Sequence, residues 1–261
     1  MKLISGYCSD KGNIREKNED AILIRSMQHE DRTFLIAVVC DGIGGLDGGE
    51  LASEFVIRKI NAWFNAVADH IRQEPIDGEV LKPYLQNAVR KWNDQLVQYM
   101  LEENLQMGST MSLIMIVNCK VYGINIGDSR VYCYNRSGIY QCTEDTSVSQ
   151  YTEGRLKVLL ESYMGKNGDL WIQNWERTLE PGDLFLLCTD GFYHFLTELD
   201  LMEMYKKIEN NTDLTLCCHE AVKNAMNRGS RDNVTLGLVY VRNPKKKQLL
   251  GLFPGGKRDN L

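Results

Sequence analysis

The chain has 261 residues, of which 43% are hydrophobic and 25% are charged, and its formal net charge is −5. This length and composition suit one globular domain with a full hydrophobic core, and the acidic balance argues against a general nucleic-acid-binding protein. The charge is uneven, because residues 242–261 carry +5 and leave −10 for the rest of the chain. We therefore expect one domain over residues 1–242 and a basic, flexible tail at 243–261.

The N-terminus and the cysteines predict a cytoplasmic protein. The first residues, MKLISGYCSDKG, have neither a long apolar core nor a small-residue cleavage pattern. No run in the chain approaches the roughly 20 apolar residues of a membrane span. The eight cysteines include no CxxC pair, which argues for reduced thiols and against disulfides or a zinc site.

The first part of the chain predicts strands followed by helices. Apolar, β-branched runs predict strands at 3–9, 20–25 and 33–40. Apolar residues at helical spacing then predict helices at 48–70 and 79–103. Leu51 and Tyr99 belong to the apolar stripes of these helices, so we expect both of them in the core.

The remaining elements predict antiparallel sheets. Between 143 and 168 lies a mostly polar, mobile excursion with one short helical patch at 156–160, and Pro181-Gly182 marks a turn. The other expected elements are strands at 109–118, 120–127, 130–135, 170–178, 183–191 and 234–241 and helices at 200–208 and 213–227. Short strands with turns at this spacing favour antiparallel sheets over βαβ units.

Acidic residues gather where apolar strands end. Asp41 closes one apolar run and is followed by Gly42, and Asp190-Gly191 closes a second run in the same way. Further acids lie in tight polar loops: Glu19, Asp20, Asp128 and Asp232. Each alone could be an ordinary turn residue. Carboxylates gathered at one end of a sheet repel one another unless cations neutralise them, and oxygen ligands suit Mg²⁺ or Mn²⁺.

In their order and neighbours, these motifs resemble those of the metal-dependent protein serine/threonine phosphatases of type 2C. The similarity spans about residues 5 to 242, and the form without extra domains is similar to bacterial members. The motifs that carry it are Arg15 with Glu19-Asp20, Asp41-Gly42-Ile43-Gly44-Gly45, Gly108-Ser109-Thr110, Gly127-Asp128-Ser129-Arg130, Thr189-Asp190-Gly191 and Asp232-Asn233. Six motifs in this order make a chance match improbable.

The resemblance implies an α+β fold, a four-layer αββα sandwich of two antiparallel sheets flanked by helices. It also implies hydrolysis of phosphoserine and phosphothreonine by a water or hydroxide that bridges two Mg²⁺ or Mn²⁺ ions, with a third, weaker ion beside them. The partners implied are phosphorylated proteins made by a serine/threonine kinase, with no nucleic acid, and we expect a monomer.

The resemblance also implies a role for each site residue. Asp41 would bridge the first two ions. The Gly42 carbonyl and Glu19 would bind the first ion, Asp190 and Asp232 would bind the second, and Asp128 with Asp190 would bind the third. Asp20 and Asn233 would support these ligands, and Arg15 would bind the substrate phosphate.

The chain departs from the family pattern at Ile43. Many members have a histidine at this position, which has been considered as the proton donor to the leaving alcohol, so the general acid is unassigned and we expect a water instead.

Two alternative functions stay open. One is a catalytically inactive regulatory or binding module on this fold, which the loss of a metal-bridging acid would mark. The other is a relative of the phosphatases that switch anti-sigma antagonists.

Overall fold

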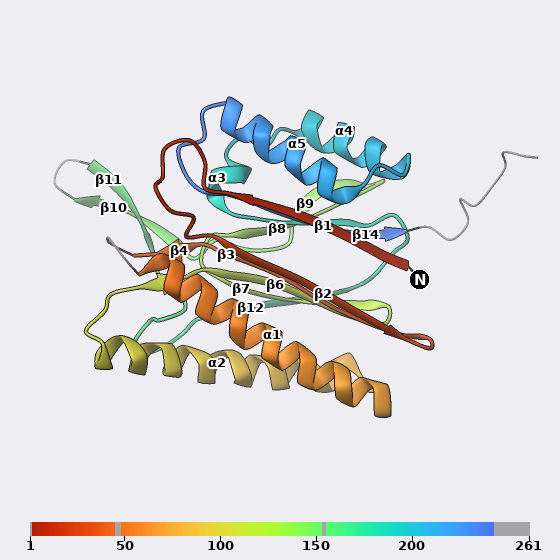
Figure 1. Cartoon of the computed structure of the whole chain (residues 1–261), viewed down its shortest axis with the longest axis horizontal. Coiled ribbons are helices and arrows are strands. Elements are labelled where there is room, and N and C mark those ends of the chain that lie inside the picture. The colour runs from red at the N-terminus through yellow and green to blue at the C-terminus, as the bar shows by residue number, and fades with distance from the viewer. Residues whose placement is uncertain (1, 45–47, 153–154, 243–261) are drawn as a thin grey trace, which may run out of the picture.

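The computed structural model describes residues 2–44, 48–152 and 155–242, and two antiparallel five-stranded sheets lie face to face at its centre (Figure 1). Helices cover the outer face of each sheet, so the layers run helix, sheet, sheet, helix. This arrangement confirms the predicted αββα sandwich.

The first sheet carries α3, α4 and α5 on its outer face. Its strands in spatial order are β1 (Lys2–Asp10), β14 (Val234–Arg242), β13 (Leu184–Cys188), β8 (Arg130–Asn135) and β9 (Gly138–Gln141). The helices are α3 (Asp190–Tyr193), α4 (Glu198–Glu209) and α5 (Leu214–Asn227). Asp213 caps α5 by accepting from the backbone N–H groups of Thr215 and Leu216, which explains where this helix begins.

The second sheet carries α1 and α2 on its outer face. Its strands in spatial order are β12 (Gln173–Thr178), β7 (Lys120–Ile126), β6 (Met111–Val117), β3 (Arg32–Cys40) and β2 (Ala21–His29), and its helices are α1 (Gly49–Gln73) and α2 (Gly78–Glu102). Two short ribbons lie outside the sheets: β4 (Gly42–Ile43) pairs with β5 (Gly108–Ser109), and β10 (Ser147–Thr152) pairs with β11 (Arg155–Leu160).

The central strands are apolar throughout because both of their faces are buried. In β3, Ile36 and Val38 pack toward the helices, whereas Ala37 and Val39 pack between the sheets. The alternation follows from the twofold period of side chains along a strand. A strand covered on both faces therefore reads as one continuous apolar run rather than as alternating residues.

Several local predictions are wrong. Residues 156–160 belong to strand β11 rather than to a helix, since they pair with β10. A short, mostly apolar segment does not distinguish the two structures. Leu51 and Tyr99 are each 41% exposed and line a surface groove between α1 and α2. Strand β9 and the short helix α3 were not predicted, and the tail predicted at 243–261 lies outside the described residues.

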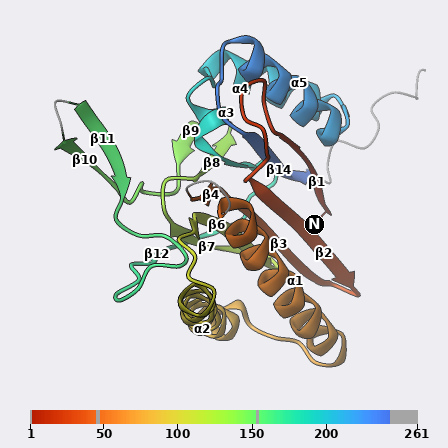
Figure 2. The ribbon, with the colours of Figure 1, turned by 60° about the vertical axis from the view of Figure 1, so that its left-hand side comes forward.

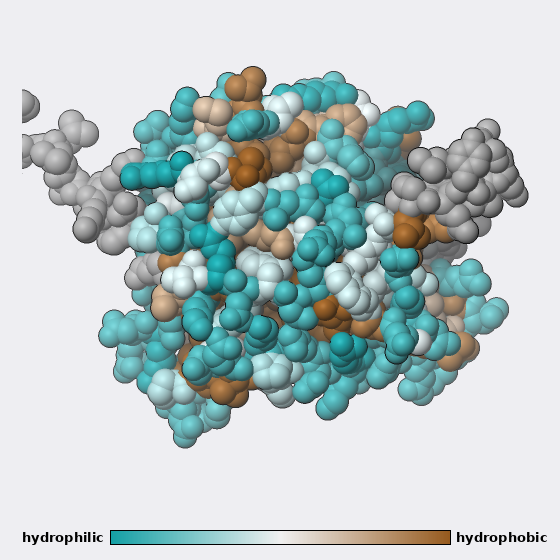
Figure 3. All heavy atoms as spheres, turned by 180° about the vertical axis from the view of Figure 1, so that it is seen from behind, coloured by the Kyte–Doolittle hydropathy of each residue, from teal (hydrophilic) through white to brown (hydrophobic). Residues whose placement is uncertain are grey.

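The face shown in Figure 3 is mostly hydrophilic, with hydrophobic residues in small separate patches. In the ranges that the structure describes, no helix has both the length and the apolar character needed to cross a membrane.

Candidate active site

The antiparallel pairing of the second sheet places Asp41 beside Glu19. Cys40, the last residue of β3, pairs with Ala21, the first residue of β2. The residue after Cys40 therefore lies next to the residues that precede Ala21. Asp41 also meets Thr110, which leads into β6: the Asp41 N–H donates to Thr110 Oγ1 at 2.8 Å, and the Thr110 N–H donates to the Asp41 carbonyl at 2.9 Å.

The first sheet gathers three more acids in the same way. Cys188 of β13 pairs with Leu236 of β14 on one side and with Arg130 of β8 on the other. Asp190 follows β13, whereas Asp232 and Asp128 precede the two neighbouring strands. These three residues, far apart in the sequence, are therefore brought to one edge of the sheet.

The strand ends of both sheets face one cavity of about 970 Å³. Its lining includes every residue that the sequence analysis assigned to metal or phosphate: Arg15, Glu19, Asp41, Gly42, Asp128, Asp190 and Asp232. Asn233 lines it as well, and Asp20 is buried, at 8% exposure, outside the lining. The structure thus brings the predicted site residues together.

Gly42 allows a very close approach of three backbone segments. Its N–H donates to the Glu19 carbonyl at 3.1 Å, and a Cβ at this position would lie 2.4 Å from the Gly49 carbonyl oxygen and 2.6 Å from that of Glu19. Any side chain would clash with backbone atoms, so only glycine fits here. The contact holds Glu19, Gly42 and the start of α1 together.

Asn233 and Asp20 fix the surroundings of the acids. The Asn233 side chain accepts the Glu19 N–H at 2.9 Å and donates to the carbonyls of Lys11 and Lys17, each also at 2.9 Å. Asp20 accepts the hydroxyls of Thr189 and Thr235 at 2.9 and 2.7 Å. Because Thr189 and Thr235 belong to the first sheet's end of the site, Asp20 joins the two halves.

Burial and mutual repulsion raise the pKa of most of these carboxyls. Burial is the largest cause in each case, and it raises the pKa of Asp20 to about 7 and that of Asp128 to about 6. The pKa of Asp41 is raised well above its ordinary value by burial and then by the charges of Asp20, Asp190 and Asp128. The carboxyls therefore resist ionising together, and a cation would relieve this repulsion.

Arg15 lines the cavity and forms an ion pair there with one of the acids. Its Nη2 donates to Asp232 Oδ2 at 2.7 Å, and both side chains are partly exposed. This hydrogen bond raises the pKa of Arg15. The sequence analysis did not predict this acidic partner.

The donor set fits a hard divalent cation. The clustered side-chain donors are carboxylate oxygens, which Mg²⁺ and Mn²⁺ prefer, and their raised pKa values record the repulsion that such a cation offsets. Within the described ranges, no three His, Cys, Asp or Glu side chains close on a single point as a finished metal cluster would. The structure thus shows a shared carboxylate-lined cavity and not a complete coordination shell.

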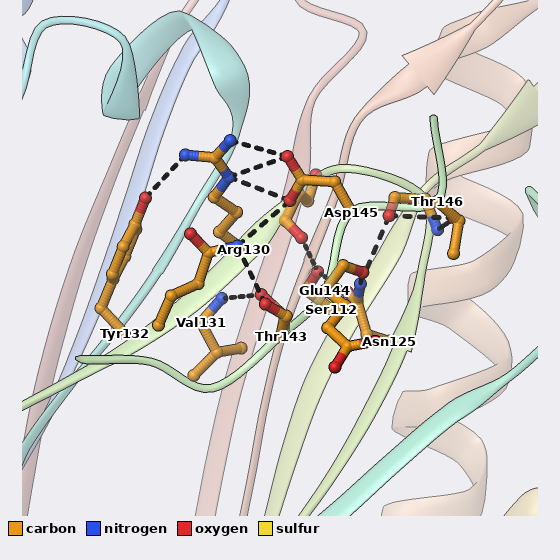
Figure 4. A network of polar contacts seen from close by, with 12 residues as sticks. Ser112, Asn125, Arg130, Val131, Tyr132, Thr143, Glu144, Asp145 and Thr146 are labelled. Atoms are coloured by element: carbon orange, nitrogen blue, oxygen red, sulfur yellow. Dashed lines mark hydrogen bonds and ion pairs between the residues drawn. The ribbon is translucent and has the colours of Figure 1, made fainter. Parts of the chain in front are cut away.

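Other residues of the cavity were not assigned from the sequence. The Arg130 guanidinium holds both oxygens of Asp145 and donates to the Tyr132 hydroxyl at 2.9 Å (Figure 4). It also lies 3.8 Å from the centre of the Tyr193 ring. Arg130 is the last residue of the motif at 127–130, so the sequence held a signal that could have identified it as a cavity residue. Asp145, Tyr193 and His194 also line the cavity, and the sequence held no local signal for them.

Comparisons with known proteins identify the family of the chain. A family model described as protein phosphatase 2C matches residues 14–225. The serine/threonine phosphatase stp of Listeria innocua is 27% identical over 249 residues, covering 89% of this chain and 94% of the relative. A putative protein phosphatase of Mycoplasma genitalium is 26% identical, with 91% and 95% covered.

Solved structures share the fold. The catalytic domain of the serine threonine protein phosphatase PstP in complex with two manganese ions superposes with a TM-score of 0.70 at 25% identity, covering 92% of this chain and 99% of that one. The serine/threonine phosphatase of S. agalactiae superposes with a TM-score of 0.75 at 19% identity, covering 92% and 100%, which speaks for the fold alone. With the family match spanning most of the sequence, the chain belongs to the protein phosphatase 2C family.

Proposed function

We propose that the protein is a Mg²⁺- or Mn²⁺-dependent phosphatase that hydrolyses phosphoserine and phosphothreonine in proteins. The observation that carries this proposal is that the five acids predicted to bind metal, which come from both sheets, line one cavity that Arg15 also lines. Relatives named serine/threonine phosphatases support the substrate class, and a relative solved with two manganese ions supports the metal requirement.

The residues that would hold the cations are Asp41 between two ions, Glu19 and the Gly42 carbonyl on one side, Asp190 and Asp232 on the other, and Asp128 with Asp190 for a third, weaker ion. Divalent cations at this place would supply the activation of water and the neutralisation of phosphate charge. Asn233 and Asp20 would keep the ligands in position, because they fix the Glu19 backbone and join the two halves of the site.

Arg15 would bind the substrate phosphate. A guanidinium has five N–H donors in a planar fork, so Arg15 can hold Asp232 and a phosphate oxygen at the same time. Its partly exposed position at the cavity suits a group that meets a phosphate arriving from solvent. The ion pair with Asp232 would then orient the guanidinium for the incoming phosphate.

The departing serine or threonine oxygen needs a proton. Ile43 lines the cavity and has no proton to give, so we assign this proton to a water molecule in the cleft.

The substrates would be proteins phosphorylated by a serine/threonine kinase, and the enzyme would oppose that kinase in signalling. An inactive binding module is disfavoured, since each acid expected to bind metal is present and lines the cavity.

Metal removal tests the proposal. We expect hydrolysis of p-nitrophenyl phosphate and of a phosphothreonine peptide to fall by more than about 10²-fold in EDTA, because the unscreened carboxylates would repel a phosphate. Adding excess Mn²⁺ or Mg²⁺ should restore both activities. A thermal melt in EDTA shows whether the protein remains folded. Undiminished hydrolysis in EDTA, or none with either ion, would contradict the proposal.

A further inference from the structure

Residues 143–168 form a flap beside the cavity, and its first end is tied to the loop that carries Asp128. The flap includes the β10–β11 hairpin, which projects from the body in both ribbon views (Figures 1 and 2). The Gly127 N–H donates to Thr146 Oγ1 at 2.8 Å, and the Thr146 N–H donates to the Gly127 carbonyl at 3.0 Å. The Asn125 amide donates to the Glu144 carbonyl at 3.0 Å (Figure 4).

The second end of the flap is tied to the segment that carries Asp41 and Gly42. Ser109 and Met164 exchange two backbone hydrogen bonds, of 3.0 and 2.8 Å. Ser109 belongs to β5, and its strand partner β4 begins at Gly42, directly after Asp41. The buried Asn93 side chain also accepts the Gly165 N–H at 2.8 Å. The flap is therefore anchored at both ends to the loops that supply the acids.

These anchors fix an apolar wall in the cavity. Leu159 and Leu160 of β11, together with Tyr163, line the same cavity as the carboxylates. The Tyr163 ring lies against Gly108, where a Cβ would come within 2.6 Å of its Cδ2. Because both flap ends hydrogen-bond to the acid-bearing loops, this wall keeps a set distance from the phosphate-binding end.

The wall exposes apolar surface. Leu159 is 44% exposed, and Val148, which pairs with it across the hairpin, is 40% exposed. Apolar surface of this kind beside a polar cleft becomes more favourable when a ligand covers it. The cavity, at about 970 Å³, is also at the upper end of the range for ligand sites. It has room for more of a polypeptide than one phosphorylated side chain.

We propose that Leu159, Leu160 and Tyr163 form a subsite for a bulky apolar residue adjacent to the phosphoserine or phosphothreonine of the substrate, a specificity that rests on the proposed function. An apolar neighbour would cover the exposed surface of Leu159, and this burial would make binding more favourable. A charged neighbour would have to lose its water of hydration against the same apolar wall, which is costly.

The test is a set of phosphothreonine peptides assayed with the Mn²⁺-loaded enzyme. Leucine, alanine or glutamate is placed at one position at a time, on either side of the phosphothreonine. We expect kcat/KM for leucine to exceed that for alanine about tenfold at one or more positions, as partial burial of a leucine side chain would give. Glutamate should be the poorest residue at the same positions.

Two variants assign the preference to the flap wall. Leu159→Asp should reduce the leucine-to-alanine ratio to about one, whereas Leu159→Met should keep it. The control is Leu199→Asp, at a leucine on α4 that is 71% exposed and outside the cavity; it should leave the ratio as in the wild type. A wild-type enzyme that hydrolyses all peptides equally, or a ratio that survives Leu159→Asp, would overturn the inference. If no peptide is hydrolysed at all, the proposed function fails with it.

Discussion

Asp41→Asn should lower kcat for p-nitrophenyl phosphate and phosphopeptides by more than about 10²-fold, without lowering the melting temperature. Asp41 follows β3, an interior strand of one sheet, and lines the same cavity as acids from the other sheet, so we expect it to hold both of the proposed cations. Its raised pKa means that the folded protein disfavours its charge. A neutral isostere should therefore maintain or raise the melting temperature measured in EDTA.

Asp213→Asn is the matched control for Asp41→Asn. Asp213 is an acid of the same fold that caps α5 and does not line the cavity. Asparagine caps a helix about as well as aspartate, so this variant should keep the wild-type kcat and melting temperature. Steady-state kinetics and thermal melts should therefore show a large loss of kcat for Asp41→Asn alone. An Asp41→Asn enzyme with wild-type kcat would remove Asp41 from the proposed metal site.

Arg15→Ala should raise KM by about 10- to 100-fold, the effect of removing hydrogen bonds worth about 1.5–3 kcal/mol to a charged ligand. The reason is that Arg15 is the cavity-lining cation beside Asp232, where phosphate would enter. Arg15→Lys should recover only part of the loss, since an ammonium cannot form the paired contacts of a guanidinium.

Arg58→Ala provides the control for Arg15→Ala. Arg58 is an arginine on α1 that pairs with Glu54 one turn away, and its side chain is 70% exposed. Removing it should change neither KM nor kcat, because exposed pairs of this kind contribute little. If Arg15→Ala keeps the wild-type KM and kcat, Arg15 is not part of the phosphate site.

Local patterns in the sequence predicted most of the strands and helices, and the family resemblance of the motifs predicted the sandwich fold and the acids of the cavity. Asp41 and Asp190 stand at the ends of strands buried on both faces, and such strands read as continuous apolar runs. The motif order then supplied Glu19, Asp128 and Asp232. Their meeting in space depends on which strands pair, and that is a property of the whole sheet rather than of any one motif.

The sequence predicted an excursion at residues 143–168, but it did not predict the two strands of this flap. Residues 156–160 form a strand only because β10 lies beside them, and a short apolar run carries no information about such a partner. The contact of Arg130 with Asp145 joins residues fifteen positions apart without any motif at the second position. Arg15 was assigned to phosphate alone, whereas the structure shows the acidic partner that holds it.

Anomalous diffraction from crystals grown with Mn²⁺ would show whether the carboxylate-lined cavity binds two cations. We expect at least two strong manganese peaks there, separated by roughly 3.5–4 Å, with Asp41 between them. Asp190 and Asp232 should lie at one peak and Glu19 at the other. A third, weaker peak would lie beside Asp128. Crystals of Asp41→Asn grown in the same way should lose at least one of the two strong peaks. An empty cavity in the wild-type crystals, or manganese bound only elsewhere on the protein, would contradict the account.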